Sequence, residues 1–156
     1  MFKLLSKIFF KFADLHFLRR KLLLTMVIKG PEDRVHIGEM CDLQDVILNT
    51  NSGHIFIGDH SFFGQGCMLL TGTHDLSLLN RERQQNHPRE GRDIKIGRGV
   101  WISSGAIVCG NVSIGDNVVI AAGAVVTKDC LEPAIYGGIP ARKLRNLLKT
   151  DADNRA

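Results

Sequence analysis

A series of aliphatic residues spaced six apart constrains the fold of this chain more than any other feature. Its members are Ile96, Ile102, Val108, Ile114, Ile120 and Val126. A small apolar residue follows four places after each member, and Gly, Asn or Asp stands at the third place. Gly, Asn and Asp tolerate the left-handed backbone conformation, so they predict a turn in every hexad.

The period of six predicts a short strand followed by a turn. Helical spacing would scatter the turn-forming residues around the helix, and strands of period two need no turn at every sixth place. Each hexad then forms one flat face of a coil and points two side chains inward. Three faces close a triangular coil, and such coils must stack to bury a core. The sequence therefore predicts an all-β fold, a parallel β-helix.

An earlier block keeps the same pattern less strictly. Its members are Ile37, Leu43, Ile57, Phe63 and Leu69. The register slips by two residues between Leu43 and Ile57, and the stretch "NTNSG" predicts an enlarged corner there. After Leu69 the pattern stops, because Asp75 occupies an aliphatic position. Residues 75–93 contain no hexad and predict a loop extruded from the coil, where function is commonly located.

The same register assigns outward positions. Side chains between two inward residues point outward. They are Trp101, Ile107, Ser113, Val119 and Val125. Exposed aliphatic residues are costly on a monomer, so they predict a subunit interface. In the earlier block His74 points outward beside the loop, whereas the other histidines, including His87, stand in no organised pattern.

Charge and cysteine content exclude some classes of function. The net charge is +4, but residues 1–24 hold six of the 20 basic residues and one of the 16 acidic ones. The remainder carries 14 basic and 15 acidic residues, which argues against a nucleic-acid partner. The four cysteines form no CxxC pair and no metal-spaced cluster. They predict free thiols in a reducing compartment and no bound metal.

Three motifs together carry a family resemblance: "TGTHD", "VWISSGAIV" and "GAVVTKD…GGIPARKLR". They resemble the hexapeptide-repeat acyltransferases, especially galactoside and maltose O-acetyltransferases and O-acetyltransferases of bacterial surface polysaccharides. The resemblance covers about residues 35–147. It implies a left-handed β-helix and a homotrimer with active sites between subunits. It also implies acetyl-CoA as the acyl donor.

The resemblance also implies roles for the residues near the loop. His74 matches the catalytic base, which takes the proton of a sugar hydroxyl during direct acetyl transfer. Trp101 matches a tryptophan that forms a wall of the active site. Asp75, directly after His74, makes this motif more similar to that of the polysaccharide enzymes than to that of the disaccharide enzymes. Gln44 and Ser52 stand where the disaccharide enzymes bind sugar through asparagine and aspartate, so the acceptor is expected to differ.

The resemblance also implies which residues bind the coenzyme. They are Ser104, Gly105, Ala122, Thr127, Lys128, Arg142 and Arg145. Ser104 and Ala122 match positions that line the pantetheine groove, next to a glycine. Thr127, Lys128, Arg142 and Arg145 match positions near the adenosine phosphates, and the three cations among them suit that anionic end.

We expect three segments. Residues 1–24 form an amphipathic helix, residues 25–139 the β-helix domain, and residues 140–156 a short C-terminal helix and tail. The first segment has no uninterrupted apolar run long enough to span a membrane and no signal-peptide cleavage site. It is expected either to cap the end of the β-helix or to lie on anionic membrane.

The sequence thus predicts a cytoplasmic, trimeric O-acetyltransferase that uses acetyl-CoA to modify a sugar of a surface polysaccharide or of its lipid-linked precursor. Peripheral attachment to the inner face of the cell membrane follows if residues 1–24 lie on the membrane, and it stays open beside the capping role. Two alternatives remain open. One is an N-acetyltransferase of an amino-sugar nucleotide, and the other is a non-catalytic β-helix scaffold.

Overall fold

The structure is a computed structural model that describes residues 26–147, and it is built almost entirely of short strands in three sheets. Sheet A contains β1 (Val27–Lys29), β3 (Val46–Asn49), β6 (Cys67–Leu70), β9 (Ile107–Cys109) and β12 (Val125–Val126). Sheet B contains β2 (Val35–Ile37), β4 (Ile55–Ile57), β7 (Ile94–Ile96) and β10 (Val112–Ile114). Sheet C contains β5 (Phe62–Phe63), β8 (Trp101–Ile102), β11 (Val119–Ile120), β13 (Ala134–Gly137) and β14 (Arg142–Asn146).

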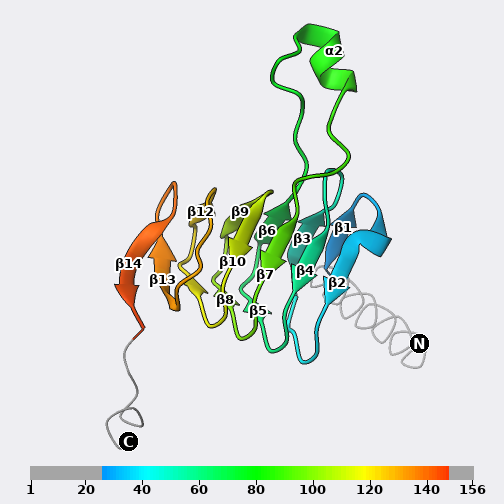
Figure 1. Cartoon of the computed structure of the whole chain (residues 1–156). Coiled ribbons are helices and arrows are strands. Elements are labelled where there is room, and N and C mark those ends of the chain that lie inside the picture. The colour runs from blue at the N-terminus through cyan, green and yellow to red at the C-terminus, as the bar shows by residue number, and fades with distance from the viewer. Residues whose placement is uncertain (1–25, 148–156) are drawn as a thin grey trace, which may run out of the picture.

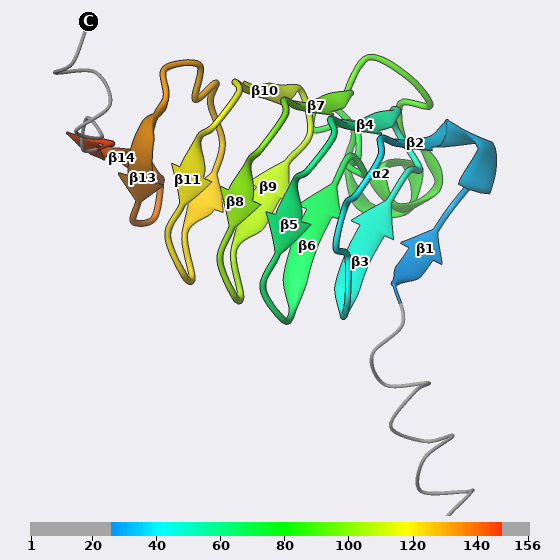
Figure 2. The same cartoon turned by 90° about the horizontal axis from the view of Figure 1, so that it is seen from below.

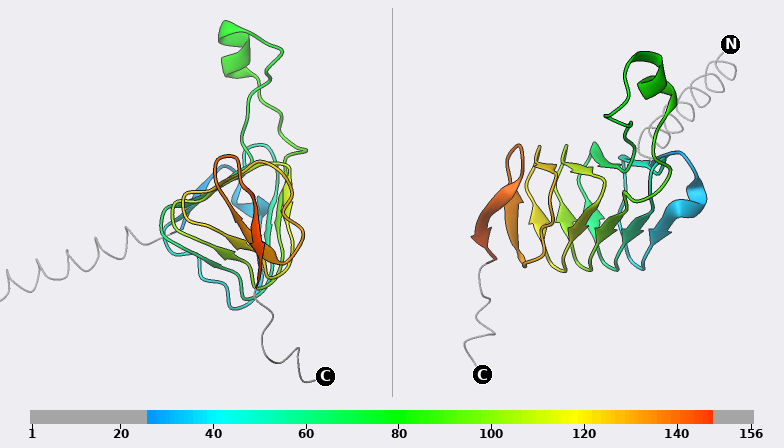
Figure 3. Two further views of the ribbon diagram at one scale, coloured as in Figure 1. Left: turned by 90° about the vertical axis from the view of Figure 1, so that its left-hand side faces the viewer. Right: turned by 45° about the horizontal axis from the view of Figure 1, so that its top comes forward.

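The three sheets are the three walls of a parallel β-helix. Each strand pairs in parallel with the strand one coil before or after it, except that β14 pairs antiparallel with β13. Viewed along its axis, the molecule is triangular (Figure 3, left), and from the side the coils stack in order from β1 to β14 (Figures 1 and 2). The predicted β-helix is confirmed.

The predicted inward positions form the core. All six aliphatic members of the period-six series are at most 4% exposed, and so are the small apolar residues that follow them. Each is covered by its counterparts one coil above and below, which is why the fold needs several coils. The earlier block packs the same way except at its start, where Ile37 remains 42% exposed.

Most of the predicted turn residues have the left-handed conformation. Gly99, Gly105, Asn111, Asn117 and Gly123 have φ between 57° and 68°. Asp129 does not share this conformation, and its carboxylate instead accepts a hydrogen bond of 2.8 Å from the backbone N–H of Ser113. The hexad turn therefore depends on residues that accept positive φ at little cost.

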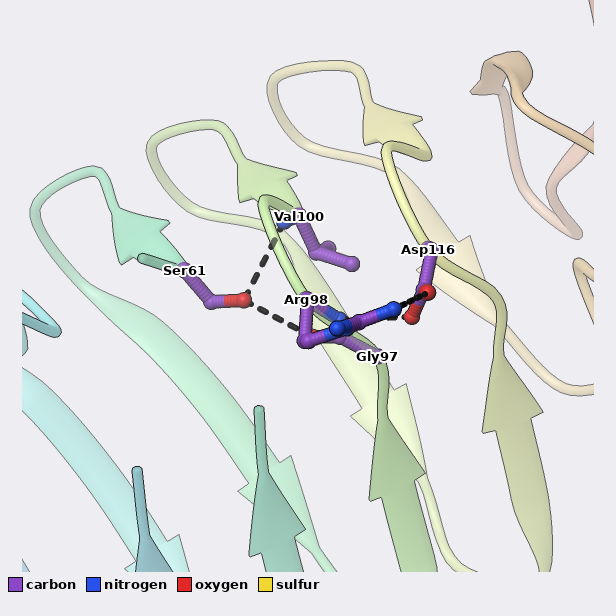
Figure 4. Close-up of polar contacts among 5 residues, drawn as sticks. All are labelled: Ser61, Gly97, Arg98, Val100 and Asp116. Carbon is purple, nitrogen blue, oxygen red and sulfur yellow. Dashed lines mark hydrogen bonds and ion pairs between the residues drawn. The ribbon is translucent and has the colours of Figure 1, made fainter. Parts of the chain in front are cut away.

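The chain turns at three corners, which we call the AB, BC and CA corners after the sheets they connect. The BC corner holds the coils close together, since a Cβ atom on Gly97 would lie 2.4 Å from Asp116 Oδ1. There the Ser61 hydroxyl donates to the Gly97 carbonyl (2.8 Å) and accepts from the Val100 N–H (3.1 Å), as Figure 4 shows. Arg98 and Asp116 form an exposed ion pair of 3.2 Å beside it.

Both interruptions of the hexad pattern fall at the AB corner. After β3 the chain makes the enlarged corner that "NTNSG" predicts, and one coil later, after β6, the long loop leaves the coil (Figures 1 and 3). The loop contains a short helix, α2 (Asn80–Gln85), and rejoins the coil just before β7. The Asn49 side chain accepts hydrogen bonds of 3.1 Å from the N–H groups of Asn51 and Gly72, which ties the two corners together.

The outward residues form one column on each sheet, and two of these columns are apolar. On sheet A the column is Val27, Ile47, Met68, Ile107 and Val125. On sheet C it is Phe62, Trp101, Val119 and Ile135. On sheet B it is the more polar His36, Phe56, Lys95 and Ser113. The predicted outward positions are confirmed. Successive members of the series lie on sheets C, A and B in turn, so they do not form a single row.

The C-terminal helix expected from residue 140 onward is wrong for the part that the structure describes. Residues Arg142–Asn146 form β14, which pairs with the free edge of β13. Pairing satisfies backbone groups of the last coil, and this overrides the weak helical preference of so short a segment. The expected N-terminal helix, residues 1–24, lies outside the described residues, as do residues 148–156.

Between residues 26 and 147, the structure contains no helix with the length and apolar character needed to cross a bilayer.

Candidate active site

His74 lies at the base of the extruded loop, immediately after the AB corner, and its side chain is exposed. Its Nδ1 atom lies 2.8 Å from the backbone carbonyl oxygen of Arg83, at the other side of the loop. A carbonyl oxygen can only accept, so Nδ1 carries the hydrogen and Nε2 of the neutral ring keeps its lone pair. The geometry therefore presents a ring nitrogen that can accept a proton from a bound molecule.

A hollow of about 460 Å³ opens beside the His74 ring. Its lining residues are Asn49, Asn51, Gly72, Thr73, His74, Gln84 and His87. Three of these side chains are amides, which both donate and accept hydrogen bonds and therefore suit a molecule rich in hydroxyl groups. The enlarged corner supplies two of the amides and α2 the third.

The sequence prediction missed several residues of this hollow. His87, expected to have no organised surroundings, lies edge-to-face with His74 at a centroid distance of 6.3 Å. Asn49, Asn51 and Gln84 were not predicted either. The available signal was that the enlarged corner and the loop leave the coil at equivalent places, one coil apart, so that their side chains meet.

The Asp75 side chain stabilises a turn of the loop. Its Oδ1 atom accepts hydrogen bonds from the Ser77 N–H (2.9 Å) and hydroxyl (2.6 Å). These bonds hold the pKa of the Asp75 carboxyl below its usual value. Asp75 also lines a second hollow of about 430 Å³, which shares His74 and His87 with the first.

The two residues expected at the sugar-binding positions lie apart from this hollow. Gln44 is exposed, but it stands at the CA corner of the first coil. Ser52 is fully buried, and its hydroxyl has no hydrogen-bond partner among the described residues. Ser52 was expected only to stand at a position where the disaccharide enzymes bind sugar, and its burial keeps it from contacting an acceptor molecule. Asn49 and Asn51, from the same enlarged corner, are the residues that face the hollow.

The residues expected beside the pantetheine arm form a column at the CA corner. Corner residues of successive coils are joined by backbone hydrogen bonds, Gly105 N–H to Gln65 (2.9 Å) and Gly123 N–H to Ser104 (3.0 Å). Ser104 and Ala122 are both exposed. A Cβ atom on Gly105 or Gly123 would meet no atom within 4 Å, so a ligand can approach the backbone closely there.

Trp101 points outward from sheet C and is 43% exposed, as predicted. Phe62 lies on the neighbouring strand and stacks on it, with centroids 5.8 Å apart and an interplanar angle of 15°. The two rings flank the CA corner and form an exposed aromatic surface beside the Ser104 column.

The residues expected near the coenzyme phosphates lie at the C-terminal end of the β-helix. Thr127 and Lys128 follow β12, whereas Arg142 and Arg145 lie on β14, and all four are exposed. The segment between them joins the stack where the Ala141 N–H donates to the Val125 carbonyl (2.8 Å). Within the described chain the two ion pairs are Arg98–Asp116 and Lys143–Glu132, so neither uses these cations.

The structure thus places the predicted site residues on opposite edges of sheet A. His74 and Asp75 follow the AB corner, whereas Gln44, Ser104, Gly105 and Ala122 lie at the CA corner. The full length of the sheet A strands separates the histidine from the groove. One chain does not bring the two groups into a single hollow.

The described residues give little support for a cysteine nucleophile or for a metal site. All four cysteines are free, and two are buried. Burial raises the pKa of the Cys67 thiol and raises that of Cys130 to about 11, so both are inert as nucleophiles near neutral pH. Residues 26–147 hold no group of three His, Cys, Asp or Glu side chains placed to bind a metal ion.

A triangular parallel β-helix built from hexads is the fold of hexapeptide-repeat proteins. Comparison with known proteins agrees. Residues 93–128 match the family model of the bacterial transferase hexapeptide (six repeats). The chain is 32% identical over 117 residues to a galactoside O-acetyltransferase of Lactococcus lactis, covering 75% of this chain and 55% of the relative.

Solved structures give the same result. An acetyltransferase from Vibrio cholerae, complexed with acetyl coenzyme A, superimposes with a TM-score of 0.67 at 27% identity, covering 88% of this chain and 78% of that one. A galactoside acetyltransferase in complex with coenzyme A gives 0.65 at 25% identity, with 90% and 72% covered. The comparisons support the hexapeptide-repeat acyltransferase family for this chain, and its fold matches the left-handed β-helix of that family. It spans about half the length of the curated relatives it matches.

Proposed function

We propose that this protein transfers an acetyl group from acetyl-CoA to a sugar hydroxyl, and that His74 is the general base. The observation that carries the proposal is the Nδ1 contact to the Arg83 carbonyl, which leaves Nε2 unprotonated beside a hollow lined by amides. A hydroxyl is a poor nucleophile at neutral pH, and a positioned imidazole removes its proton as it attacks.

The reaction then needs no covalent enzyme intermediate. Nε2 takes the hydroxyl proton while the oxygen attacks the thioester carbonyl, and backbone N–H groups at the coil edge stabilise the oxyanion. The tetrahedral intermediate collapses as the carbon–sulfur bond breaks. The imidazolium returns its proton to the leaving thiolate, so the products are an acetyl ester and CoA.

Acetyl-CoA is proposed to lie along the CA corner. The open backbone at Gly105 and Gly123 accommodates the pantetheine arm, and the cations at the C-terminal end face the phosphates. Relatives whose structures hold acetyl-CoA or CoA share this fold, which supports the assignment. The acceptor would then meet Gln44 and Trp101 from the coenzyme side.

A homotrimer would complete the site, because His74 of one copy would face the CA corner of the next. The apolar outward columns of sheets A and C support this arrangement, since both flank the CA corner and would be covered in an assembly. Free cysteines and the use of acetyl-CoA are consistent with a cytoplasmic protein.

The proposed acceptor is a sugar of a surface polysaccharide or of its lipid-linked precursor. The basic segment 1–24 would hold the protein at anionic membrane near such a precursor. Co-sedimentation with anionic vesicles tests this attachment, and equal binding by a chain that starts at Thr25 would contradict it.

The direct test of function is acetyl transfer to a panel of glycosides and amino sugars, followed as release of CoA thiol. An acetylated glycoside that hydroxylamine deacetylates is the expected product, because hydroxylamine cleaves esters and spares amides. A hydroxylamine-resistant product would indicate N-acetyl transfer. Calorimetry that detects no binding at millimolar CoA would instead indicate a non-catalytic scaffold.

A further inference from the structure

Arg83 makes two of the side-chain hydrogen bonds that hold the extruded loop together, beside those of Asp75, Asn86 and Arg34. From His74 to Gly91 only Leu78 and Arg83 are half-buried, and every other side chain is exposed. The Arg83 guanidinium donates from Nε to the Leu78 carbonyl (2.6 Å) and from Nη2 to the Leu76 carbonyl (3.3 Å). It therefore ties α2 to residues 76–78, the segment that leads into the helix, where no apolar core is available to do so.

The backbone of the same residue orients His74. The Arg83 carbonyl oxygen is the acceptor 2.8 Å from His74 Nδ1, and it belongs to α2, whose position the guanidinium fixes. In free imidazole either nitrogen can carry the hydrogen, and a hydrogen bond at one of them selects the tautomer. A carbonyl held in place at Nδ1 selects the form in which Nε2 can act as a base.

We propose that Arg83 is a positioning residue, which fixes the tautomer and orientation of His74 by locking the loop through its guanidinium. This inference rests on the proposed role of His74 and adds the residue that supports it. A misplaced base costs activity steeply, because proton transfer depends on sub-ångström geometry. Arg81 is the matched control, since it lies on the same helix, is exposed, and forms no hydrogen bond through its side chain within the described residues.

The test combines kinetics with nitrogen NMR of the full chain labelled at histidine. His74→Ala identifies the His74 signals. In the unmodified protein His74 should be the Nδ1–H tautomer, and Arg83→Ala should move it toward the Nε2–H form. With the acceptor found in the glycoside panel, Arg83→Ala should lower kcat by about 10–100-fold and leave KM for acetyl-CoA within about twofold. Arg81→Ala should change neither quantity.

Arg83→Lys keeps the charge and one donor, so it should recover part of kcat and of the Nδ1–H signal. It also serves as the second variant if Arg83→Ala does not fold. An Nε2–H tautomer in the unmodified protein would overturn the inference. A fall in kcat without a change of tautomer, or Arg83 variants that match Arg81→Ala, would overturn it as well. Full activity of His74→Ala would instead refute the proposed role of His74 as the base. The tautomer measurement needs no acceptor molecule, so the two failures can be distinguished.

Discussion

The two edges of sheet A differ in what they expose to solvent. At the AB corner the hexad pattern breaks twice, and the breaks carry exposed polar side chains, among them His74 and Asn51. At the CA corner the pattern continues from coil to coil, and what is exposed is mainly backbone, at Gly105 and Gly123. One edge presents polar side chains, and the other presents open backbone.

This difference indicates how a repetitive fold acquires chemistry. Regular coils can present a groove for a long, flexible ligand without any irregular residue, because every turn repeats the same open backbone. A proton-accepting side chain needs a position of its own, so the chain must leave the coil to supply it. Neither edge suffices alone, which is why we propose that a second copy brings them together.

The largest effect is expected at the AB corner. His74→Ala should lower kcat by roughly 10²–10⁴-fold, the usual contribution of a general base. The melting temperature should not change, because the side chain is exposed and packs against no core residue. Steady-state kinetics and thermal unfolding check both statements. Gln85→Ala, in the same loop but outside both hollows, is the control.

An intermediate effect is expected at the CA corner. Ala122→Trp should raise KM for acetyl-CoA by about 10-fold or more, since a large ring would occupy the groove beside Gly123. Stability should hold, because Ala122 is exposed. Leu131→Trp adds a similar ring at the BC corner, where Leu131 is 60% exposed, and should leave KM unchanged. Equal KM values in the two variants would contradict the placement of the coenzyme at the CA corner.

The smallest effect is expected at the BC corner, to which we assign no ligand. Arg98→Ala removes an ion pair whose side chains are 72% and 47% exposed. Such pairs contribute about 0–1 kcal/mol, so urea unfolding should show a loss within that range. Neither kcat nor KM should change. A clear loss of activity would show that the third corner also takes part in function.

Much of this architecture could be predicted from the sequence, because the hexad repeats one local rule. Inward residues such as Ile120, turn residues such as Asn117 and the extruded loop all follow from it. The prediction failed where the rule ends. Asn51 was missed while its buried neighbour Ser52 was matched to a sugar-binding position, and β14 was expected to be a helix.

These failures have a physical origin. Ser52 and Asn51 are neighbours in an irregular corner, so spacing alone cannot tell which of them faces inward. The contact between His74 and the Arg83 carbonyl depends on how the loop folds back on itself, and a sequence without a repeat carries no signal for that. Strand β14 depends on the free edge of β13, which is a tertiary feature.

The most direct test of the central claim is complementation between two impaired variants, His74→Ala and Ala122→Trp, assembled together at equal amounts and assayed at acetyl-CoA concentrations well below the raised KM, where both parents are weak. In a mixed trimer, one interface joins an intact His74 to an intact CA corner of the neighbouring copy. Random mixing in a closed ring of three then predicts recovery of about one quarter of the unmodified activity. Activity no greater than the mean of the two parents would contradict the account, because it would mean that each chain completes its own site.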